Sequence, residues 1–465
     1  MGVATVAVLD VGKSNVKLSA CTAEGAVVET LSTPNPLRPG PPWQHHDLDA
    51  LNPWVMRGLA ALSARHPLTD VVATGHGSAA ALVVADPDAG GTGLALPMID
   101  YDQPLPPAVA TAYAPLAGGF ADRGSALMMG ASHIARQMVW AEMAEPAGFA
   151  RAAHVLGLPQ YWAWRLSGVA ASEVSVLGAQ SHLWRVRDGV WAPLVAARGW
   201  GRLLPPLARA GDVLGPVRPA MQVRWGLPPL SVHVGAHDSS VGFHRYQAAG
   251  LDDVVVISTG TWIVGMAAAV DPARLDETRG MTLNADMAGR PLAGALCMGG
   301  RDYAAIAGAQ PETMASPDGQ ARLIAQGTLA VPSFGPDSGQ FPGSAGKGRL
   351  IGPVPRTAAG RHALAVLHVA LLALACGETL APERPWVLDG SFLRDPAFAG
   401  LVAGLRPGRE TLVNPDSHGI ASGAALLCRH GDGVVPLNLQ PAEPLELPGL
   451  MAYARRWRDL AGGAA

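Results

Sequence analysis

The sequence contains few cysteines, and their spacing excludes two kinds of stabilised small domain. The four cysteines lie far apart and none stands in a C-x-x-C pair: Cys21, Cys297, Cys376 and Cys428. Structural zinc sites and disulfide frameworks both need cysteines in paired, short spacings. We therefore expect free, buried thiols in a reducing compartment.

Charged residues are also scarce, at 15 % of 465 residues, with a formal net charge of -3. No run of lysine or arginine offsets this composition locally. Proteins that bind nucleic acid need a basic surface to meet the phosphate backbone. We therefore expect no nucleic-acid partner.

Segments for secretion or for spanning a membrane are missing as well. The N-terminus has no basic region and reaches Asp10 after too few apolar residues for a signal peptide. The most apolar stretch, residues 363–376, is too short to cross a bilayer and is followed by Gly377-Glu378. We expect a cytoplasmic protein without a membrane partner, in which this stretch is a buried helix.

Apolar residues are plentiful, at 49 % of a chain that is too long for one ordinary core, so we predict two domains. Helical spacing occurs at residues 48–64, 126–143, 157–166 and 449–460. Strand-like runs occur at residues 3–10, 15–21, 26–29 and 70–75. The Pro-, Gly- and Ser-rich stretch 315–356 predicts long surface loops. The mixture of helices and strands indicates an α/β fold.

Three later strands end in small, hydroxyl-bearing or acidic turns. The strands at residues 230–234, 253–257 and 385–388 lead into Gly235-Ala-His-Asp238, Ser258-Thr-Gly-Thr261 and Asp389-Gly-Ser391. Open α/β sheets bind ligands at the carboxyl ends of their strands. We therefore expect these turns to line a binding site.

The residues of these turns suit phosphoryl transfer. A phosphoryl group in transfer spreads negative charge over its oxygens, so the reaction needs hydrogen-bond donors, a metal ion and a base. Asp10, at the end of the first strand, is the candidate ligand of Mg²⁺ through water, and Asp238 is the candidate base. Gly12 and Gly260 allow backbone N–H groups to approach phosphate oxygens.

Simpler interpretations compete with these roles. Asp10 could only form a turn, and Asp238 could only cap a helix. The turn at Ser258 could be a polar strand exit. Gly12-Lys-Ser14 imitates part of a Walker A loop, but Ala7 stands where its first glycine should be, so we reject a P-loop.

Histidines and an asparagine also have two interpretations. His45-His46 with Asp47 could bind a metal, but adjacent side chains of an extended segment point apart, so we favour a solvated loop. His237 is expected to support the site or contact the substrate. Asn284 is a substrate contact or, equally, an ordinary turn residue.

The motifs, taken in order, resemble those of the FGGY carbohydrate kinase family, within the actin-like, ribonuclease H-like ATPases. They are Asp10-x-Gly12 with Ser14 and Lys17, Trp43-Gln-His-His-Asp47, Thr74-Gly-His-Gly77, Pro159 to Gly168 with Ser172-Glu173, Gly235 to Asp238, Ser258 to Thr261, and Asp389-Gly-Ser391 with Gly419-Ile-Ala-Ser-Gly423. The resemblance covers nearly the whole chain.

The resemblance implies a two-domain α/β fold of the actin-like ATPase type with an interdomain cleft. Residues 1–243 would form the sugar-binding domain, and residues 244–465 the nucleotide-binding domain with a terminal helix at 449–460. The reaction would use ATP and Mg²⁺ to phosphorylate a small-molecule sugar. The oligomeric state, a homodimer included, stays open.

The resemblance also assigns roles to individual residues. Asp238 would be the catalytic base and Asp10 the Mg²⁺ ligand. The phosphate and ATP contacts would be Gly12, Ser14, Asn15, Lys17, Ser258, Thr259, Gly260, Thr261, Asp389, Gly390, Ser391 and Gly423. The sugar contacts would be His76, Gly77, His237, Asp238 and Asn284.

The chain departs from the family pattern at three places. Lys13 follows Gly12 where many relatives carry a small hydroxyl residue, Asp389 precedes Gly390 where a glycine run is usual, and no arginine follows Pro97 to partner an acid.

The resemblance implies a ketose phosphorylated at a terminal hydroxyl, first a 6-deoxyketohexose of the L-fuculose or L-rhamnulose type. The apolar residues 79–82 could meet its methyl group.

Two alternatives accompany this expectation. A ketopentose such as xylulose or ribulose is the second substrate class, because one methyl group contributes only about 1–3 kcal/mol to discrimination. A catalytically silent sugar or nucleotide sensor on the same fold is the alternative of another functional class.

Overall fold

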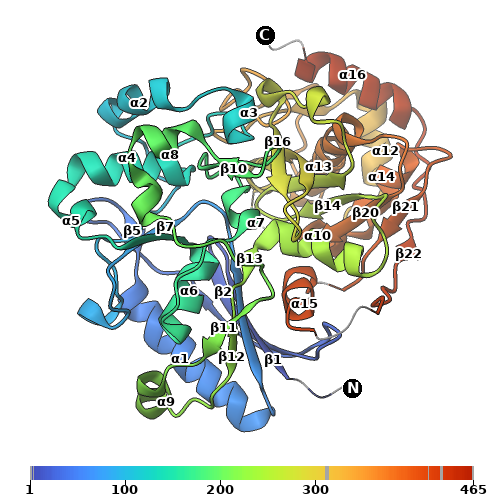
Figure 1. Ribbon diagram of the computed structural model, residues 1–465. Helices are drawn as coiled ribbons and strands as arrows, with labels where there is room; N and C mark the ends of the chain where they lie inside the picture. Colours follow the sequence, from blue (N-terminus) through green and yellow to red (C-terminus); the bar gives the residue numbers. More distant parts are fainter. Residues whose placement is uncertain (1–2, 4, 309–313, 417, 430–432, 463–465) are drawn as a thin grey trace. The chain divides into compact units, whose positions relative to one another are not determined.

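The computed structural model describes residues 3, 5–308, 314–416, 418–429 and 433–462 (Figure 1). The chain divides into two compact units. The first unit comprises Met1–Gly250, Leu283–Pro291 and His418–Val435, and the second comprises Leu251–Thr282, Leu292–Ser417 and Pro436–Ala465. The predicted boundary at residue 243 falls inside helix α10 (Asp238–Ala248), and two later segments belong to the first unit because they pack with its core.

The sheet of the first unit has the strand order β11-β12-β6-β1-β2-β3, and β13 pairs with β6. These strands are β1 (Val6–Val11), β2 (Asn15–Cys21), β3 (Val27–Pro34), β6 (Asp70–Gly75), β11 (Val213–Pro216), β12 (Ser231–His233) and β13 (Ala236–His237). Strands β1 and β13 both run parallel to β6. Their carboxyl ends therefore meet at one edge, which brings Asp10, the turn after Gly75 and His237 together.

Helices and short strands complete the first unit. The helices are α1 (Leu48–Arg65), α2 (Pro107–Tyr113), α3 (Phe120–Arg123), α4 (Ile134–Ala144), α5 (Pro146–Ala150), α6 (Leu158–Ser167), α7 (Val174–Leu177), α8 (Pro193–Ala197), α9 (Pro219–Trp225), α10 and α15 (Gly419–Leu426). The short strands are β4 (Leu37–Arg38), β5 (His45–His46), β7 (Ala80–Val83), β8 (His154–Gly157), β9 (Trp184–Arg185) and β10 (Val190–Trp191). Short 3₁₀ turns lie at Ala89–Gly91, Ala114–Leu116 and Trp200–Leu203.

Two apolar clusters hold the first sheet. Helices α1 and α6 pack on one cluster, to which Trp162 and Trp164 both contribute fully buried rings. Helices α10 and α15 contribute to the other. Burial of large aromatic side chains stabilises such a core strongly.

The helix predicted at 126–143 is shorter than expected, because α4 begins only at Ile134. Gly130 adopts a left-handed φ of 50°, and a Cβ there would lie 2.5 Å from the carbonyl oxygen of Gln103. A left-handed residue with this close approach interrupts a helix. Residues 126–133 form a loop instead.

The sheet of the second unit has the order β16-β17-β15-β14-β20-β21-β22. The strands are β14 (Val255–Thr259), β15 (Ile263–Ala268), β16 (Met281–Ala285), β17 (Pro291–Cys297), β20 (Trp386–Gly390), β21 (Thr411–Val413) and β22 (Gln440–Pro441). Strands β14 and β20 are parallel, with Thr259 opposite Gly390. The turns that follow them therefore lie at the same end of the sheet, as the sequence predicts.

The helices of the second unit are α11 (Gly299–Ala307), α12 (Pro317–Gln326), α13 (Ala358–Leu380), α14 (Pro396–Gly404) and α16 (Leu450–Gly462), with 3₁₀ turns at Pro272–Arg274, Glu277–Arg279 and Ser391–Arg394. Among the described residues, α13 alone is long and apolar enough to cross a membrane, but 83 % of its most apolar window is buried in the protein. It is the core helix that the sequence predicts. All four cysteines are free and buried, also as predicted.

The prediction of loops over 315–356 is wrong in part. Helix α12 and the strands β18 (Leu329–Val331) and β19 (Arg349–Ile351) occupy much of this stretch. Ser316 caps α12 by accepting from the backbone N–H of Gly319, and Leu323 and Ile324 are buried. A capped start and an apolar face are sufficient to form a helix in a Pro- and Gly-rich stretch.

Candidate active site

Asp10 ends β1 on the first unit and lies beside a second carboxylate. It pairs in register with Lys17 of β2 and Thr74 of β6. Burial, and then repulsion by Asp238, raise the pKa of Asp10 to about 7, although Lys17 opposes the shift. Two carboxylates that repel each other in this way form a site for a cation.

Asp238 is the first residue of α10, and His237 occupies the cap position, so Asp238 is not the simple N-cap. Its Oδ1 accepts from the backbone N–H of Ser239 at 2.6 Å and from the Ser239 hydroxyl at 3.2 Å. Among the described residues, none donates to its other oxygen, Oδ2. One oxygen is therefore fixed, and the other is available to a substrate hydroxyl.

The ring of His237 is oriented by a chain of hydrogen bonds. Ser240 Oγ donates to the carbonyl of Ala285 at 3.0 Å and lies 3.1 Å from His237 Nδ1. His237 Nε2 lies 3.2 Å from Asp238 Oδ1, so the ring is held between Ser240 and Asp238. Burial lowers the pKa of this imidazole.

Glu173 supports the same segment from beneath. Its carboxylate accepts from the backbone N–H groups of Ser175 and Val176 and from the Ser175 hydroxyl at 2.6 Å. Ser175 Oγ in turn accepts from the backbone N–H of His237 at 3.1 Å. Burial raises the pKa of Glu173 to about 7. The sequence marks Glu173 only as part of a family motif, so this supporting role was missed.

His76 follows β6 and has polar atoms that lack partners. Both its ring nitrogens are buried, and no described residue bonds to either. Its ring lies 5.2 Å from that of Tyr101 and 5.9 Å from that of His46. Burial lowers its pKa well below the ordinary value. A buried polar atom without a partner is unfavourable, so these nitrogens are candidate contacts for a ligand.

Gly77 has a packing role. A Cβ at this position would lie 2.5 Å from the Cβ of Ala179 and 3.3 Å from the ring of His237. Only glycine fits this close approach. The structure thus uses Gly77 to seat the His76 segment.

An acid–cation pair forms where the sequence lacks the expected arginine. Lys13, from the turn after β1, forms an ion pair with Asp100, which is fully buried. Gln44 Nε2 donates to the other carboxylate oxygen of Asp100 at 2.6 Å. Lys13 Nζ also lies 5.0 Å above the ring of Tyr101. Lys13 therefore extends toward Asp100. The sequence analysis did not predict that Lys13, Asp100 and Gln44 would meet.

His46 corrects the expectation of a solvated loop. It belongs to β5, is 3 % exposed, and its Nε2 has no partner among the described residues. Burial lowers its pKa to about 4. His45 turns the other way and bonds the carbonyl of Trp43 at 2.9 Å. The two rings point apart as predicted, and the described residues contain no group of three metal-ligating side chains.

The turn between β1 and β2 is held by Asn35. Gly12 N–H donates to the carbonyl of Asn15 at 3.0 Å, and Asn35 Nδ2 donates to the carbonyl of Gly12 at 2.8 Å. The Asn35 N–H donates to the carbonyl of Ser14 at 2.9 Å. Ser14, Asn15 and Lys17 are exposed. The turn is rigid, and its side chains are available for a phosphate.

The candidate second phosphate turn, residues 258–261, lies in the second unit, and its residues differ in what they contact. Thr259 is buried, and its hydroxyl donates to the carbonyl of Asp389 at 2.8 Å and accepts from the N–H of Phe392 at 3.2 Å. Thr259 therefore holds the two turns together. Ser258 and Thr261 are exposed, and a Cβ at Gly260 would meet nothing within 4 Å. These three residues can face a ligand.

The turn after β20 packs tightly on the same strand end. Gly390 has φ 95°, and a Cβ there would lie 2.2 Å from the carbonyl oxygen of Thr259. Ser391 Oγ donates to that carbonyl at 3.3 Å, and Asn414 Nδ2 donates to the buried Asp389 at 3.4 Å. Glycine is required at position 390 because of this positive φ and because of the close approach to the carbonyl of Thr259. The Asp389-Gly390 departure is thus accommodated by Asn414.

An aromatic pair beside this turn was not predicted. Tyr303 of α11 and Phe392 have ring centroids 5.6 Å apart. The hydroxyl of Tyr303 bonds His362 Nδ1 at 2.8 Å, and His362 Nε2 bonds Asp395 at 2.7 Å. Because these residues come from separate elements, no local pattern could have joined them.

Two of the predicted contacts, Gly423 and Asn284, have packing or hydrogen-bond partners within the first unit. Gly423 lies in α15 of the first unit, where a Cβ would approach the carbonyl oxygen of Val241 to 2.2 Å, so it serves helix packing. Asn284 is buried, and its Oδ1 accepts from Gln180 at 3.1 Å. The apolar residues 79–82 are buried in and before β7, and Ala79 and Ala81 belong to the core. They therefore form no evident methyl pocket.

Known proteins share this fold and part of the sequence. Residues 252–436 match the family model described as carbohydrate kinase FGGY, C-terminal domain. A carbohydrate kinase from Novosphingobium aromaticivorans has a TM-score of 0.83 at 28 % identity over 99 % of both chains. Xylulose kinase from Rhodospirillum rubrum has a TM-score of 0.73 at 20 % identity, over 97 % of this chain and 96 % of that one.

A curated relative matches over a shorter range. L-fuculokinase of Haemophilus influenzae is 28 % identical over 130 residues, which are 28 % of this chain and 27 % of that protein. The match thus spans only about a quarter of that relative's length.

The fold places the protein among the two-domain α/β kinases of actin-like ATPase architecture. Residues 252–436 therefore form a C-terminal domain of the FGGY carbohydrate kinase type, and the whole chain is similar in fold to a carbohydrate kinase.

Proposed function

We propose that this protein is an ATP-dependent kinase that phosphorylates a terminal hydroxyl of a ketose. One observation carries the proposal: three groups lie at the same edge of the first sheet. They are the free Oδ2 of Asp238, the carboxylate of Asp10 and the unpartnered nitrogens of His76. A base, a cation site and open hydrogen-bonding groups together are what transfer to an alcohol requires.

The base and its support define the first step. Asp238 Oδ2 would accept the proton of the sugar hydroxyl, whose oxygen forms the new bond to the terminal phosphorus as the bond to the leaving diphosphate breaks. Ser239 holds Oδ1, and the Glu173–Ser175 pair holds the His237 backbone, so the base is fixed in orientation. Such pre-organisation lowers the barrier because no reorientation is needed during transfer.

The carboxylate pair fits Mg²⁺, which prefers oxygen ligands and uses one or two carboxylates with water and phosphate. Asp10 would hold the ion, whose charge would offset the burial and the repulsion by Asp238 that raise the pKa of Asp10. When bound, Mg²⁺ neutralises charge on the transferring phosphoryl group. Asp10 would act through water, as the family resemblance implies.

The second unit supplies candidate phosphate and nucleotide contacts. The exposed Ser258 and Thr261 and the open backbone at Gly260 would donate to phosphate oxygens. The first turn of α11 lies against them, because the N–H of Gly300 donates to the carbonyl of Thr261 at 3.1 Å. A helix N-terminus favours anions. Tyr303 beside the turn would offer a flat surface to the adenine base.

The sugar would bind against a polar wall. Lys13, Asp100 and Gln44 form a fixed charged group, and His46 and His76 contribute neutral rings with unpartnered nitrogens. Neutral imidazoles both donate and accept, which matches sugar hydroxyls. Because Lys13 pairs with Asp100 in place of an arginine, glycerol belongs in the set of substrates to be measured.

We propose a 6-deoxyketohexose of the fuculose or rhamnulose type as the first substrate class, supported by the partial likeness to an L-fuculokinase. A ketopentose is the second, supported by the structural likeness to a xylulose kinase. Because ATP is an intracellular substrate, we also propose a cytoplasmic location.

A panel of sugars tests both the activity and its specificity. ADP release would be followed with fuculose, rhamnulose, xylulose, ribulose and glycerol, with Asp238→Asn as the inactive control. The highest kcat/KM for a deoxyketohexose supports the first assignment, and a preference for a pentose or glycerol refutes it. A protein that binds a sugar without releasing ADP is the sensor instead of the kinase.

A further inference from the structure

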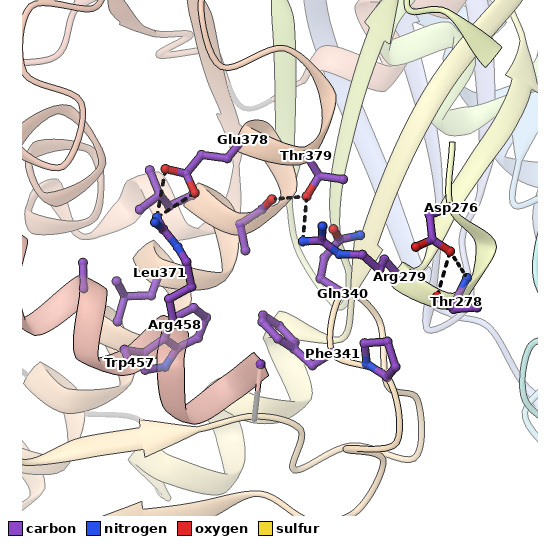
Figure 2. Close-up of a pocket in the computed structure, with 15 residues that line it drawn as sticks. Asp276, Thr278, Arg279, Gln340, Phe341, Leu371, Glu378, Thr379, Trp457 and Arg458 are labelled. Atoms are coloured by element: carbon purple, nitrogen blue, oxygen red, sulfur yellow. Dashed lines mark hydrogen bonds and ion pairs between the residues drawn. The ribbon is translucent and has the colours of Figure 1, made fainter. Parts of the chain in front are cut away.

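A cavity of about 530 Å³ lies in the second unit, away from every residue assigned to nucleotide binding (Figure 2). The later turns of α13, helix α16, residues 340–342 and the 3₁₀ turn before Gly280 surround it. None of residues 258–261 or 389–391 lines it. Its size is that of small-molecule sites.

Gln340 is the first sign of a ligand. Its side chain lines the cavity, and the residue is only 2 % exposed. Both its amide oxygen and its amide nitrogen are buried without a partner among the described residues. An amide left unbonded in the interior is unfavourable, so a group that both donates and accepts is expected opposite it.

The charges on the wall leave one cation without a carboxylate. Arg458 is paired with Glu378, with contacts of 3.0 and 2.7 Å to its two oxygens (Figure 2). Asp276 accepts from the N–H and the hydroxyl of Thr278 at 2.9 and 2.7 Å. Among the residues that the structure describes, Arg279 contacts no carboxylate and has only a 3.5 Å contact with the Thr379 hydroxyl. Its guanidinium is therefore available to an anion.

The rest of the wall is apolar and partly aromatic. Phe341 and Trp457 meet edge to face, with ring centroids 5.4 Å apart. Trp457 Nε1 is already used, because it donates to the carbonyl of Ala330 at 2.8 Å. Leu371 and Leu374 of α13 complete this side. Such a surface suits the C–H face of a ring and offers it no further hydrogen bond.

We propose that this cavity binds a sugar ring carrying one anionic group, with its hydroxyls at Gln340, its anion at Arg279 and its C–H face against Trp457. The anion can be a phosphate or a carboxylate, since a guanidinium binds either. The site is separate from the proposed catalytic residues and does not depend on the proposed activity.

Calorimetric titration of the full chain with glucose 6-phosphate, glucuronate and glucose tests the proposal. We expect one of the two anionic sugars to bind and neutral glucose to bind at least about tenfold more weakly. The ligand that binds identifies the anion as phosphate or carboxylate. Hydrogen exchange should slow in residues 371–379 and 450–462 on binding. Absence of binding by both anionic sugars, or protection confined to other segments, overturns the proposal.

Two variants and a matched control locate the contacts. Arg279→Gln should weaken binding about tenfold or more, and Arg274→Gln, on an exposed arginine outside the cavity, should leave it within about twofold. Gln340→Leu should weaken binding without lowering the unfolding temperature, because it removes an unbonded buried amide. Unchanged binding in Arg279→Gln or in Gln340→Leu overturns the assignment.

Discussion

Asp10→Asn should make the free protein more stable at alkaline pH while it removes catalysis. The pKa of Asp10 rises from 3.8 to about 7 through burial and the charge of Asp238. A pKa shift of this size corresponds to a loss of about 4 kcal/mol in the free energy of unfolding when Asp10 ionises. Because the residue is partly exposed, we expect a loss of about 1–2 kcal/mol. Asparagine does not ionise, so Asp10→Asn avoids this loss.

The sign follows from the two states. Well below pH 4 Asp10 is protonated in both the folded and the unfolded protein, so its ionisation does not lower the free energy of unfolding. Between pH 4 and 7 the unfolded chain releases the proton while the folded chain keeps it, so the free energy of unfolding falls as the pH rises. The advantage of Asp10→Asn over the natural protein should therefore grow from pH 5 to pH 8. Glu173 titrates in both proteins, so its effect cancels.

Urea denaturation at pH 5 and pH 8 measures this difference, with Asp459→Asn, at an exposed position of α16, as the control. Mg²⁺ should stabilise the natural protein at pH 8 and not Asp10→Asn, and turnover with Mg²⁺ and ATP should fall far more than sugar affinity. An equal stability difference at both pH values, or a loss of stability at pH 8, would refute the burial and repulsion assigned to Asp10.

Three further variants probe the rest of the site. Asp238→Asn should lower kcat by about 10²–10⁴ with sugar affinity almost unchanged, and near-normal turnover removes it as the base. Lys13→Met should weaken sugar binding and destabilise the fold by about 2–4 kcal/mol, because the charge of Asp100 is left buried and unpaired. The double variant Lys13→Met with Asp100→Asn should recover the stability but not the sugar affinity. Denaturation measures the first property and sugar titration the second. Gly260→Val should raise the KM for ATP without changing the unfolding temperature, since its Cβ would enter open space, whereas Gly390→Ala should lower that temperature. Unaltered ATP binding in folded Gly260→Val would place the phosphate elsewhere.

Gly260 and Gly390 differ in what glycine does at each position. The positive-φ glycines of the described chain include Gly390 and not Gly260. Gly390 is needed for its conformation and its close approach to Thr259, whereas a Cβ at Gly260 would enter open space, and Gly260 stays a predicted phosphate contact. The backbone angles depend on the pairing of β14 with β20, which the sequence of either turn does not contain.

The sequence by itself determined the strands and the turns that end them. Apolar alternation and a following glycine are local signals, and they located β1, β2, β6, β14 and β20 with the acids and hydroxyls at their ends. The parallel α/β pattern then placed these turns at ligand-binding edges. The candidate base and the candidate metal ligand were found in this way.

Only the tertiary structure decided which distant residues meet. Lys13 pairs with Asp100 across 87 positions of sequence, and His46 lies against His76 from another strand. Gly423 packs on α10 of the first unit, because the backbone carbonyl of Val241 occupies the space that a side chain at position 423 would need. Such contacts depend on strand register and helix packing, which bring together residues that have no common local pattern. The polar wall of the proposed sugar site therefore could not be predicted from the sequence.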